Sequence, residues 1–221
     1  MSRLTASDFV TIGRAALGGE TSEVMSDAVL LRFFNQAMQE ECSYWRMPEL
    51  LDSQTITTAD GTQSYSLDSD TMFIAKVIDS TSTAELTEIS KVEYDRWTLG
   101  NTSDTGTPIF WCVAGTSSGD LLFYPYKIPD GVYSLIATFY HDPTEMVLSP
   151  TPTSMEIHRA WDEVVLNKGI SKGWRYLGDL EKAQAFNYYA GDARKAAIKA
   201  SIRSSSYTPR LGSMVGKTGM I

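Results

Sequence analysis

The spacing of apolar residues changes twice along this chain of 221 residues. From Thr5 to about Trp45, apolar side chains recur every three or four positions, which is the period of an amphipathic helix. Short alternating runs replace this pattern between Pro48 and Pro150, and the helical period then returns as far as about Ser204. Because helices and strands bury their apolar side chains at different periods, the pattern predicts a helical protein interrupted by a β module.

Start and stop signals define two helices in the first part of the chain. Thr5 and Asp8 form a typical helix start, and Gly18-Gly19 are expected to end that helix. The second predicted helix begins at Ser26-Asp27 and ends before Pro48, because a proline cannot continue a helix. Its apolar residues share one side, so we expect that face to be buried.

The middle of the chain is predicted to form five or six short strands. Residues 53–58 and 63–67 flank Asp60-Gly61, and Asp-Gly between two alternating runs predicts a β-hairpin. The other strand-like runs are 72–78, 109–114, 121–124 and 132–140, and residues 89–97 fit a short helix. Because a sandwich, a barrel and a curled sheet are all built from such strands, the topology of the β module stays open.

Helical spacing returns in residues 154–178 and 179–204. Thr153 followed by Glu156 matches a capping box at the start of the first helix, and Asp179 is the expected cap of the second. One stripe of the last helix holds mostly small side chains, which we expect to pack closely against the preceding helix or the first two. The stripe consists of Ala183, Phe186, Tyr189, Ala190, Ala193, Ala196, Ala197 and Ala200.

These signals together predict an α+β fold. The N-terminal and C-terminal helices are expected to form one helical bundle, with an inserted antiparallel β module and an extended C-terminal arm. The predicted parts are residues 1–50 and 151–204 for the bundle, 51–150 for the β domain and 205–221 for the arm. With 43% apolar residues, the chain can fill one core or two closely joined lobes.

Cysteine use and hydropathy indicate a chain that is made in a reducing cytoplasm. Cys42 lies in a helical pattern and Cys112 in a strand pattern, outside any CxxC motif, so both are predicted to be buried free thiols. No apolar run reaches the roughly 18 residues of a membrane span, and the N-terminus lacks the apolar core of a signal peptide. We therefore expect the chain to be made and to fold in a cytosol, without a membrane partner.

Positive charge is concentrated toward the C-terminus, although the net charge of the chain is -8. From Lys168 onward, ten Lys and Arg residues stand against three acids. Such an excess can complement the dipole of the last helices. Alternatively, it can bind an acidic surface on another subunit, in head-to-tail or layer-to-layer docking.

Residues 205–221 lack helical or strand periodicity and are interpreted as an arm. Fully extended, they reach about 55 Å, which is enough to contact a neighbouring protein. We expect the arm to be disordered in a free monomer and ordered when docked, whereas a frayed terminus without a role is the alternative. Its candidate binding residues combine apolar anchors with two cations: Tyr207, Arg210, Leu211, Met214, Val215, Lys217, Met220 and Ile221.

No catalytic site is predicted, so the chain is not expected to be an enzyme. His141 and His158 lie outside any nucleophile motif and are assigned surface or structural roles. The carboxylate pairs Glu40-Glu41 and Asp162-Glu163 would have to face each other across a cleft to cleave a glycoside, but adjacent helical residues point apart. We expect these pairs to be solvated or to form contacts between subunits.

No cofactor or metal site is predicted either. Residues 115–120 contain two glycines but lack the order of a phosphate-binding loop, and they are interpreted as a turn between strands. Asp68-Ser69-Asp70 lacks the later glycine and glutamate of a calcium loop.

Four segments of the chain, taken in order, have a recognisable pattern of residue type and spacing: Glu40-Glu41-Cys42-Ser43-Tyr44-Trp45, Thr55-Ile56-Thr57-Thr58-Ala59-Asp60-Gly61, Trp161-Asp162-Glu163-Val164-Val165 and Asp179-Leu180-Glu181-Lys182-Ala183. With these segments the chain resembles the head-to-tail adaptor proteins of tailed bacteriophages. The resemblance covers nearly the whole chain.

This resemblance implies a structural virion protein at the head-tail interface, with a part in genome ejection. About a dozen subunits would form a homo-oligomeric ring under the portal protein, with C-terminal arms in crevices between portal subunits and with tail or nozzle proteins on the other side. Double-stranded DNA would pass through the lumen without specific recognition, as the net acidic body also suggests. The alternatives are a tail-completion or stopper protein, or an adaptor that cleaves peptidoglycan, an activity for which no motif is carried over.

Overall fold

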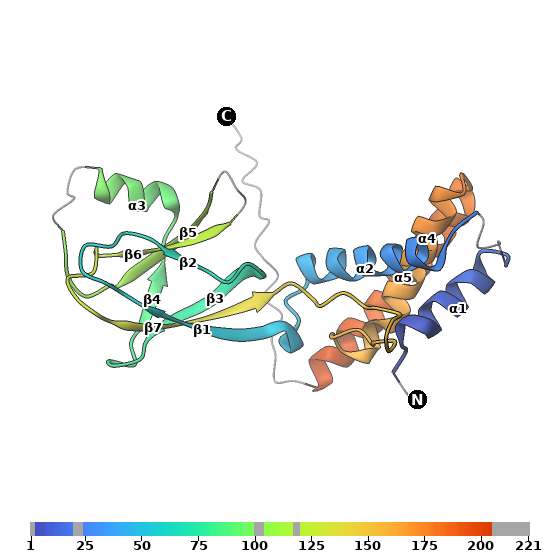
Figure 1. Cartoon of the computed structure of the whole chain (residues 1–221), viewed down its shortest axis with the longest axis horizontal. Helices are drawn as coiled ribbons and strands as arrows, with labels where there is room; N and C mark the ends of the chain where they lie inside the picture. Colours follow the sequence, from blue (N-terminus) through green and yellow to red (C-terminus); the bar gives the residue numbers. More distant parts are fainter. Residues whose placement is uncertain (1–2, 20–23, 100–103, 117–119, 205–221) are drawn as a thin grey trace. The chain divides into compact units, whose positions relative to one another are not determined.

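The computed structural model describes residues 3–19, 24–99, 104–116 and 120–204. It confirms a mixed α and β protein and divides the chain into two compact units (Figure 1). The helical unit consists of the residues up to Arg46 and those from Pro143 onward, whereas Met47–Asp142 form the β unit. The β unit is thus an insertion between the second and the third long helix of the other unit. None of the helices in the described residues has both the length and the apolar character that a membrane span requires.

Both predicted N-terminal helices are present. Helix α1 spans Ala6–Ala16, and its cap is reciprocal, since Thr5 Oγ1 accepts from Asp8 N and Asp8 Oδ2 accepts from Thr5 N at 2.8 Å. Helix α2 spans Asp27–Tyr44 and starts from Ser26, whose Oγ accepts from Val29 N at 3.3 Å. These caps satisfy backbone N–H groups that the first turn of a helix leaves without partners.

The start of the third long helix was predicted wrongly. Helix α4 spans Asp162–Tyr176 and follows a 3-10 turn, η2 (Arg159–Trp161), so it does not begin at residue 154. Thr153 and Glu156 do not form a capping box, because Thr153 Oγ1 accepts from Val147 N and Glu156 Oε2 accepts from Thr144 N, each at 2.9 Å. Hydrogen bonds to backbone groups six and twelve residues earlier therefore replace the predicted capping bonds.

The last helix, α5, spans Leu180–Ser204 and begins where the sequence predicted it. Asp179 Oδ1 accepts from Lys182 N at 3.0 Å, which confirms Asp179 as the cap. Gly178, with a φ of +84°, makes the left-handed turn that ends α4 and lets α5 fold back onto it.

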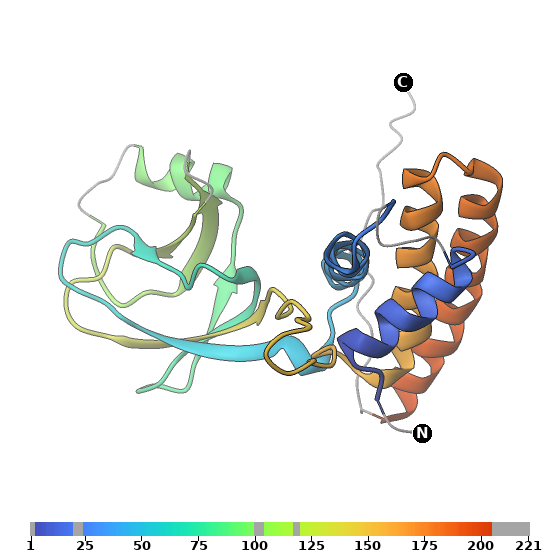
Figure 2. The same ribbon diagram turned by 45° about the vertical axis from the view of Figure 1, so that its right-hand side comes forward.

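Close helix packing in the helical unit depends on small residues. The ring of Phe34 on α2 packs against Gly13 on α1 and Gly169 on α4, where a Cβ atom would lie 2.6 Å and 2.1 Å from ring carbons. Figure 2 shows α4 between α2 and α5. On α5, Ala183, Ala190, Ala193 and Ala197 are buried, and Ser171 Oγ on α4 donates to Ala183 O at 2.7 Å. The predicted stripe is therefore confirmed at these four alanines, but Tyr189 and Ala196 are exposed.

The β unit contains one seven-stranded sheet in the order β1-β7-β3-β4-β5-β6-β2. A 3-10 turn, η1 (Pro48–Leu50), leads into it. The strands are β1 (Leu51–Thr57), β2 (Tyr65–Ser66), β3 (Thr71–Asp79), β4 (Glu85–Glu88), β5 (Phe110–Gly115), β6 (Leu121–Tyr126) and β7 (Ser134–His141), and helix α3 spans Lys91–Thr98. Strands β4 and β5 pair in parallel and the other pairs are antiparallel, so the prediction of a purely antiparallel module is wrong.

The hairpin predicted around Asp60-Gly61 is also wrong. A tight turn does occur there, because Thr62 N donates to Ala59 O at 3.1 Å and Gly61 has a φ of +69°. The strands on its two sides part, however, since β1 pairs with β7 and β2 pairs with β6. The long ladder that joins β1 to β7 outweighs the local preference of the turn.

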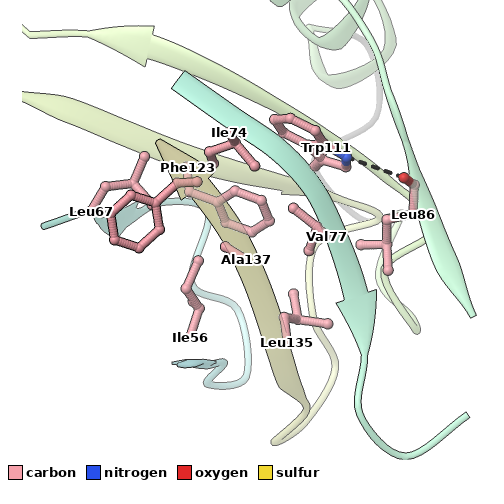
Figure 3. Close-up of a cluster of buried hydrophobic side chains, with 10 residues drawn as sticks. Ile56, Leu67, Ile74, Val77, Leu86, Trp111, Phe123, Leu135 and Ala137 are labelled. Carbon is pink, nitrogen blue, oxygen red and sulfur yellow. Dashed lines mark hydrogen bonds between the residues drawn. The ribbon is translucent and has the colours of Figure 1, made fainter. Parts of the chain in front are cut away.

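A single apolar core shows that the sheet is curled. Ile56 on β1 and Leu67 after β2 come from opposite edges of the sheet, yet both pack in the cluster that contains Phe123 (Figure 3). In a flat sheet these edges would be roughly 29 Å apart. Of the three topologies that the sequence left open, the structure has the curled sheet. Its core consists of Ile56, Leu67, Ile74, Val77, Leu86, Trp111, Phe123, Leu135, Ala137 and Phe139.

Candidate assembly surface

The predicted arm lies outside the described residues. This holds for all its candidate binding residues: Tyr207, Arg210, Leu211, Met214, Val215, Lys217, Met220 and Ile221. The helix from which the arm continues, α5, is described as far as Ser204. The contacts that hold this helix therefore define the base of the predicted arm.

A buried ion-pair cluster ties α5 to α2 and α4. The carboxylate of Glu41 on α2 is 1% exposed and accepts two hydrogen bonds from Arg194 on α5, Nε to Oε2 at 2.8 Å and Nη2 to Oε1 at 2.6 Å. Lys168 on α4 donates to the same Oε1 at 2.8 Å. A buried carboxylate is tolerated when charged donors surround it, and the paired donors of an arginine also fix the direction of approach.

Two lysines of α4 extend this cluster toward solvent. Lys168 Nζ also lies 2.8 Å from Oε2 of Glu40, and Lys172 Nζ lies 2.5 Å from Oε1 of Glu40. Partial burial acts to raise the pKa of Glu40, but the hydrogen bonds from Lys168 and Lys172 outweigh it and leave that pKa lowered. The pKa of Arg194 is raised by its hydrogen bonds to Glu41, so the guanidinium group stays charged at neutral pH.

This ion-pair cluster was not predicted from the sequence. Glu40 and Glu41 were expected to be solvated or to contact another subunit, and for Glu41 this is wrong, because its partners belong to the same chain. Its position offered a signal, since Glu41 follows the buried Phe34 and Met38 of α2 at helical spacing. A carboxylate in line with a buried face requires cationic partners on the helices that cover it.

The other carboxylate pair is divided between surface and interior. Glu163 is exposed, whereas Asp162 is 9% exposed, so the prediction for Asp162 is wrong as well. Asp162 Oδ2 accepts from Leu4 N at 3.3 Å, and Oδ1 is buried without a hydrogen-bond partner among the described residues. Burial raises the pKa of Asp162, and the hydrogen bond from Leu4 N and the nearby charges of Arg3 and Arg159 offset only part of this effect.

The histidines take part in local backbone contacts. His158 Nδ1 accepts from Ala160 N at 3.2 Å and caps η2, and His141 Nδ1 donates to Asp142 O at 2.8 Å. Both agree with the structural roles predicted for them.

Both cysteines are buried thiols that form no disulfide, which confirms that prediction. Burial raises the pKa of Cys112 to about 11, which makes its thiol a poor nucleophile at neutral pH.

The remaining candidate sites are also accounted for by turns. Thr116 N donates to Asp120 O at 2.8 Å, which agrees with a turn between β5 and β6, although the residues between them lie outside the described ranges. Asp68 and Asp70 are exposed, and their carbonyl oxygens accept from Thr71 N and Asp142 N at 3.0 and 2.8 Å. The described residues contain no group of three side chains that could hold a metal ion.

The face of α5 opposite its alanine stripe is exposed. Tyr188 is 68% exposed and Tyr189 is 53% exposed, and their ring centroids lie 6.3 Å apart. The exposed residues around them are Glu181, Gln184, Ala185, Asp192, Lys195, Ala196 and Lys199. We call this set, with the two tyrosines, the outer face of α5.

The two units differ strongly in charge. The β unit, Met47–Asp142, contains fourteen Asp and Glu residues and four Lys and Arg residues, a formal charge of -10. The rest of the chain contains thirteen acids and fifteen bases, a formal charge of +2. The acidity of the protein therefore belongs to the inserted unit.

Comparison with known proteins identifies the family. No curated protein matches the chain. The family model described as SU10 adaptor protein matches residues 4–213, which takes in both units and the first part of the predicted arm. This match confirms the resemblance inferred from the sequence. The chain therefore belongs to the SU10 adaptor protein family, a family of phage head-to-tail adaptors and hence of structural virion proteins.

Proposed function

We propose that this protein assembles as a ring on the portal and extends the DNA channel toward the tail. The observation that carries the proposal is the family match, which spans residues 4–213 and so continues past the end of α5 into the predicted arm. A family of structural adaptors makes a role in assembly, and not in catalysis, the function to test first.

The ion-pair cluster supports an anchoring role for the C-terminal end. An arm transmits force to the body only if its base is fixed, and Glu41 holds α5 through the paired hydrogen bonds of Arg194. Arms from about twelve copies would then enter crevices between portal subunits, through their apolar side chains and through Arg210 and Lys217. Tail or nozzle proteins would bind the opposite side of the ring.

The charge distribution supports a channel that does not grip DNA. Binding to duplex DNA depends on cations that neutralise phosphates, and the β unit carries a formal charge of -10. In this proposal the ring forms in the host cytoplasm, becomes part of the virion and lets the genome slide through its lumen during ejection.

Reconstitution on purified portal tests the proposal. The full chain, mixed with portal, should form a discrete ring visible by electron microscopy, and a chain truncated after Ser204 should stay folded by circular dichroism but bind poorly. Unchanged binding of the truncated chain would remove the arm from the mechanism. Binding to purified tails and not to the portal would identify a tail-completion or stopper protein instead.

Zymography on peptidoglycan tests the remaining alternative. A clear band that persists in the purified full chain and disappears with a single carboxylate substitution would show hydrolase activity. We expect no such band.

A further inference from the structure

Strand β1 forms an edge of the seven-stranded sheet, and its backbone is paired on one side. Its neighbour is β7, and the last bond of that ladder runs from Thr58 N to Tyr133 O at 2.9 Å. Successive residues of a strand direct their backbone groups to opposite sides, so the even-numbered residues of β1 bond to β7. The odd-numbered residues therefore direct their N–H and C=O groups to the open edge.

Local bonds satisfy only part of this open edge. Leu51 N donates within η1, and Ser53 N donates to Asp52 Oδ1 at 2.7 Å. No described residue accepts from the N–H groups of Thr55 and Thr57. An unpaired strand edge is a template on which an extended peptide can add as a further strand.

The two edges of the sheet differ in their protection. Strand β2, at the other edge, has two residues, and short edge strands are one means by which proteins avoid unwanted pairing. Strand β1 has seven residues in unbroken register with β7 and contains no proline or lysine, the residues that commonly block an edge. Strand β1 is therefore the edge that can receive another strand.

The surroundings of β1 favour a cationic strand. Residues 49–70 contain no Lys or Arg, and their five carboxylates are exposed and form no ion pair with a described residue. Asp68 lies beside β1, because its N–H group donates to Gln54 Oε1 at 3.3 Å. Opposite charges on two partners increase the rate of association and disfavour wrong partners. The five acids are Glu49, Asp52, Asp60, Asp68 and Asp70.

The predicted arm contains a segment of matching length and charge. Residues 205–221 include Arg210 and Lys217 and no acid, and residues 210–217 contain no proline. In an extended strand Arg210 and Lys217 would lie about 23 Å apart, because each residue adds about 3.3 Å. The seven residues of β1 span about the same length.

We propose that residues 210–217 of one copy add as a strand to the β1 edge of a second copy, in subunits that have not met the portal. Each copy has one arm and one open edge, so each copy can give and receive one strand. This contact goes beyond the proposed function, in which the same arm enters a crevice of the portal. Before assembly, strand addition covers the open edge and holds the arm.

Photo-cross-linking of the full chain without portal tests the contact. The change is Met214→p-benzoylphenylalanine, in the middle of the proposed strand, in an equal mixture of light and ¹⁵N-labelled copies. Trypsin releases β1 in one peptide, residues 47–76, because no Lys or Arg lies between Arg46 and Lys76. Mass spectrometry should find cross-links to residues 51–57 of this peptide. Pairs of one light and one heavy chain should be as frequent as all other pairs together.

Each other outcome overturns the contact. Cross-links confined to pairs of equal label would place the arm on its own chain. Cross-links outside residues 51–57, or none over a concentration series, would show that the arm does not occupy this edge. The same amino acid at Ile12, which is 40% exposed on α1, is the control, and equal yields from positions 214 and 12 count against the contact as well. Because no portal is present, these outcomes are independent of the proposed ring.

A proline on the open edge provides a second measurement. Thr55→Pro removes an N–H group that faces away from β7, so it leaves the ladder between β1 and β7 intact. It should lower the yield of the cross-link by about tenfold, because it removes one hydrogen bond and places a ring against the incoming strand. Thr55→Ala keeps the N–H group and is the matched control. Circular dichroism establishes that both variants are folded, and equal yields from the two overturn the proposal.

A pair of neutral substitutions in the arm leaves the β unit unchanged. Arg210→Gln with Lys217→Gln should lower the yield by about tenfold at low salt and by less at high salt, because the carboxylates beside β1 lose their counter-charges. Lys195→Gln with Lys199→Gln makes the same change in net charge on the exposed outer face of α5 and serves as the control. Equal loss in both pairs, or no loss in the first, overturns the proposal.

Discussion

The helical unit and the β unit exclude water by different means. In the β unit, ten apolar residues from six strands and the turn after β2 form one core. In the helical unit, the contacts of α2 with α1, α4 and α5 combine the Phe34 ring, held between two glycines, with the buried carboxylate of Glu41 and its cations. The first arrangement depends on the volume of the apolar side chains. The second also depends on the balance of buried charges and on glycine at the two positions that contact Phe34.

This difference predicts different kinds of sensitivity. An apolar core tolerates swaps that conserve volume, but a buried charge that loses its partner has no inexpensive replacement. Substitutions should therefore affect the stability of the two units differently. Hydrogen-exchange mass spectrometry can follow each unit by its own peptides.

The largest loss is expected from Phe123→Ala in the β unit. Phe123 is 0% exposed and stacks on Trp111 at 6.1 Å between centroids, so its removal should cost about 3–5 kcal/mol of unfolding free energy. Exchange should accelerate in residues 47–142 and stay unchanged in α2 and α4. Val132→Ala, at a site that is 77% exposed, should change stability by less than about 0.5 kcal/mol. Faster exchange in both units would show that they unfold together.

A loss of similar size is expected from Glu41→Gln in the helical unit. Neutral glutamine leaves Arg194 and Lys168 without their buried counter-charge, at a cost of about 3–5 kcal/mol. The matched control is Glu40→Gln one residue earlier, where the side chain is 45% exposed and the loss should stay below about 1 kcal/mol. Urea denaturation measures both, and equal losses would mean that the buried cluster is no stronger than a surface ion pair.

Two glycine substitutions in the helical unit should have opposite signs. Gly169→Ala places a methyl group against the Phe34 ring and should destabilise the protein by about 1–3 kcal/mol. Gly191→Ala on α5 meets no atom within 4 Å and should stabilise it by about 0.5–1 kcal/mol, because alanine favours a helix. Melting temperatures measure both effects. No loss at Gly169 would contradict the close approach of α2 and α4, and a loss at Gly191 would contradict the open space around that residue.

The smallest expected effect is a change in pH dependence from Asp162→Asn. Because folding raises the pKa of Asp162, its carboxyl group binds a proton more readily in the folded state, and its contribution to stability grows as pH falls through that raised pKa. The asparagine variant lacks this gain. Its melting temperature relative to the natural protein should therefore be higher at pH 7 than at pH 4, and a difference independent of pH would refute the raised pKa.

Local signals made much of the helical unit predictable. Thr5, Ser26 and Asp179 each cap the helix that the sequence assigned to them, and Pro48 lies just beyond the end of α2. A cap acts on backbone groups within three residues, so no knowledge of distant segments is needed to recognise it. The signal at Thr153 failed because its side chain bonds to Val147 instead.

The β unit was less predictable because its pairings join distant segments. Asp60-Gly61 makes the expected turn, but the partners of the two strands are more than fifty residues away. Strand β4 was not predicted, since Glu85–Glu88 has a single buried side chain, Leu86. Strand β4 is held by a contact from another strand, because Trp111 Nε1 on β5 donates to Leu86 O at 3.2 Å (Figure 3).

The candidate assembly surface was also only partly predictable from the sequence. The excess of cations near the C-terminus was visible in the sequence, but Lys168, Lys172 and Arg194 turn out to be partnered within the chain. Only burial and contacts with other helices separate these cations from Lys195 and Lys199, which are exposed on the outer face of α5, where Lys195 pairs with Asp192 of the same helix.

The insertion of one unit into the other also determines the order in which contacts can form during synthesis. Helices α1 and α2 leave the ribosome first, but Gly169 and Lys168, against which α2 packs, are added only after the whole β unit has been translated. At 5–20 residues per second, this interval lasts roughly 6 to 25 seconds. During that time the apolar face of α2 and the carboxylate of Glu41 lack their final partners. The nascent chain therefore exposes most apolar surface to chaperones in this interval.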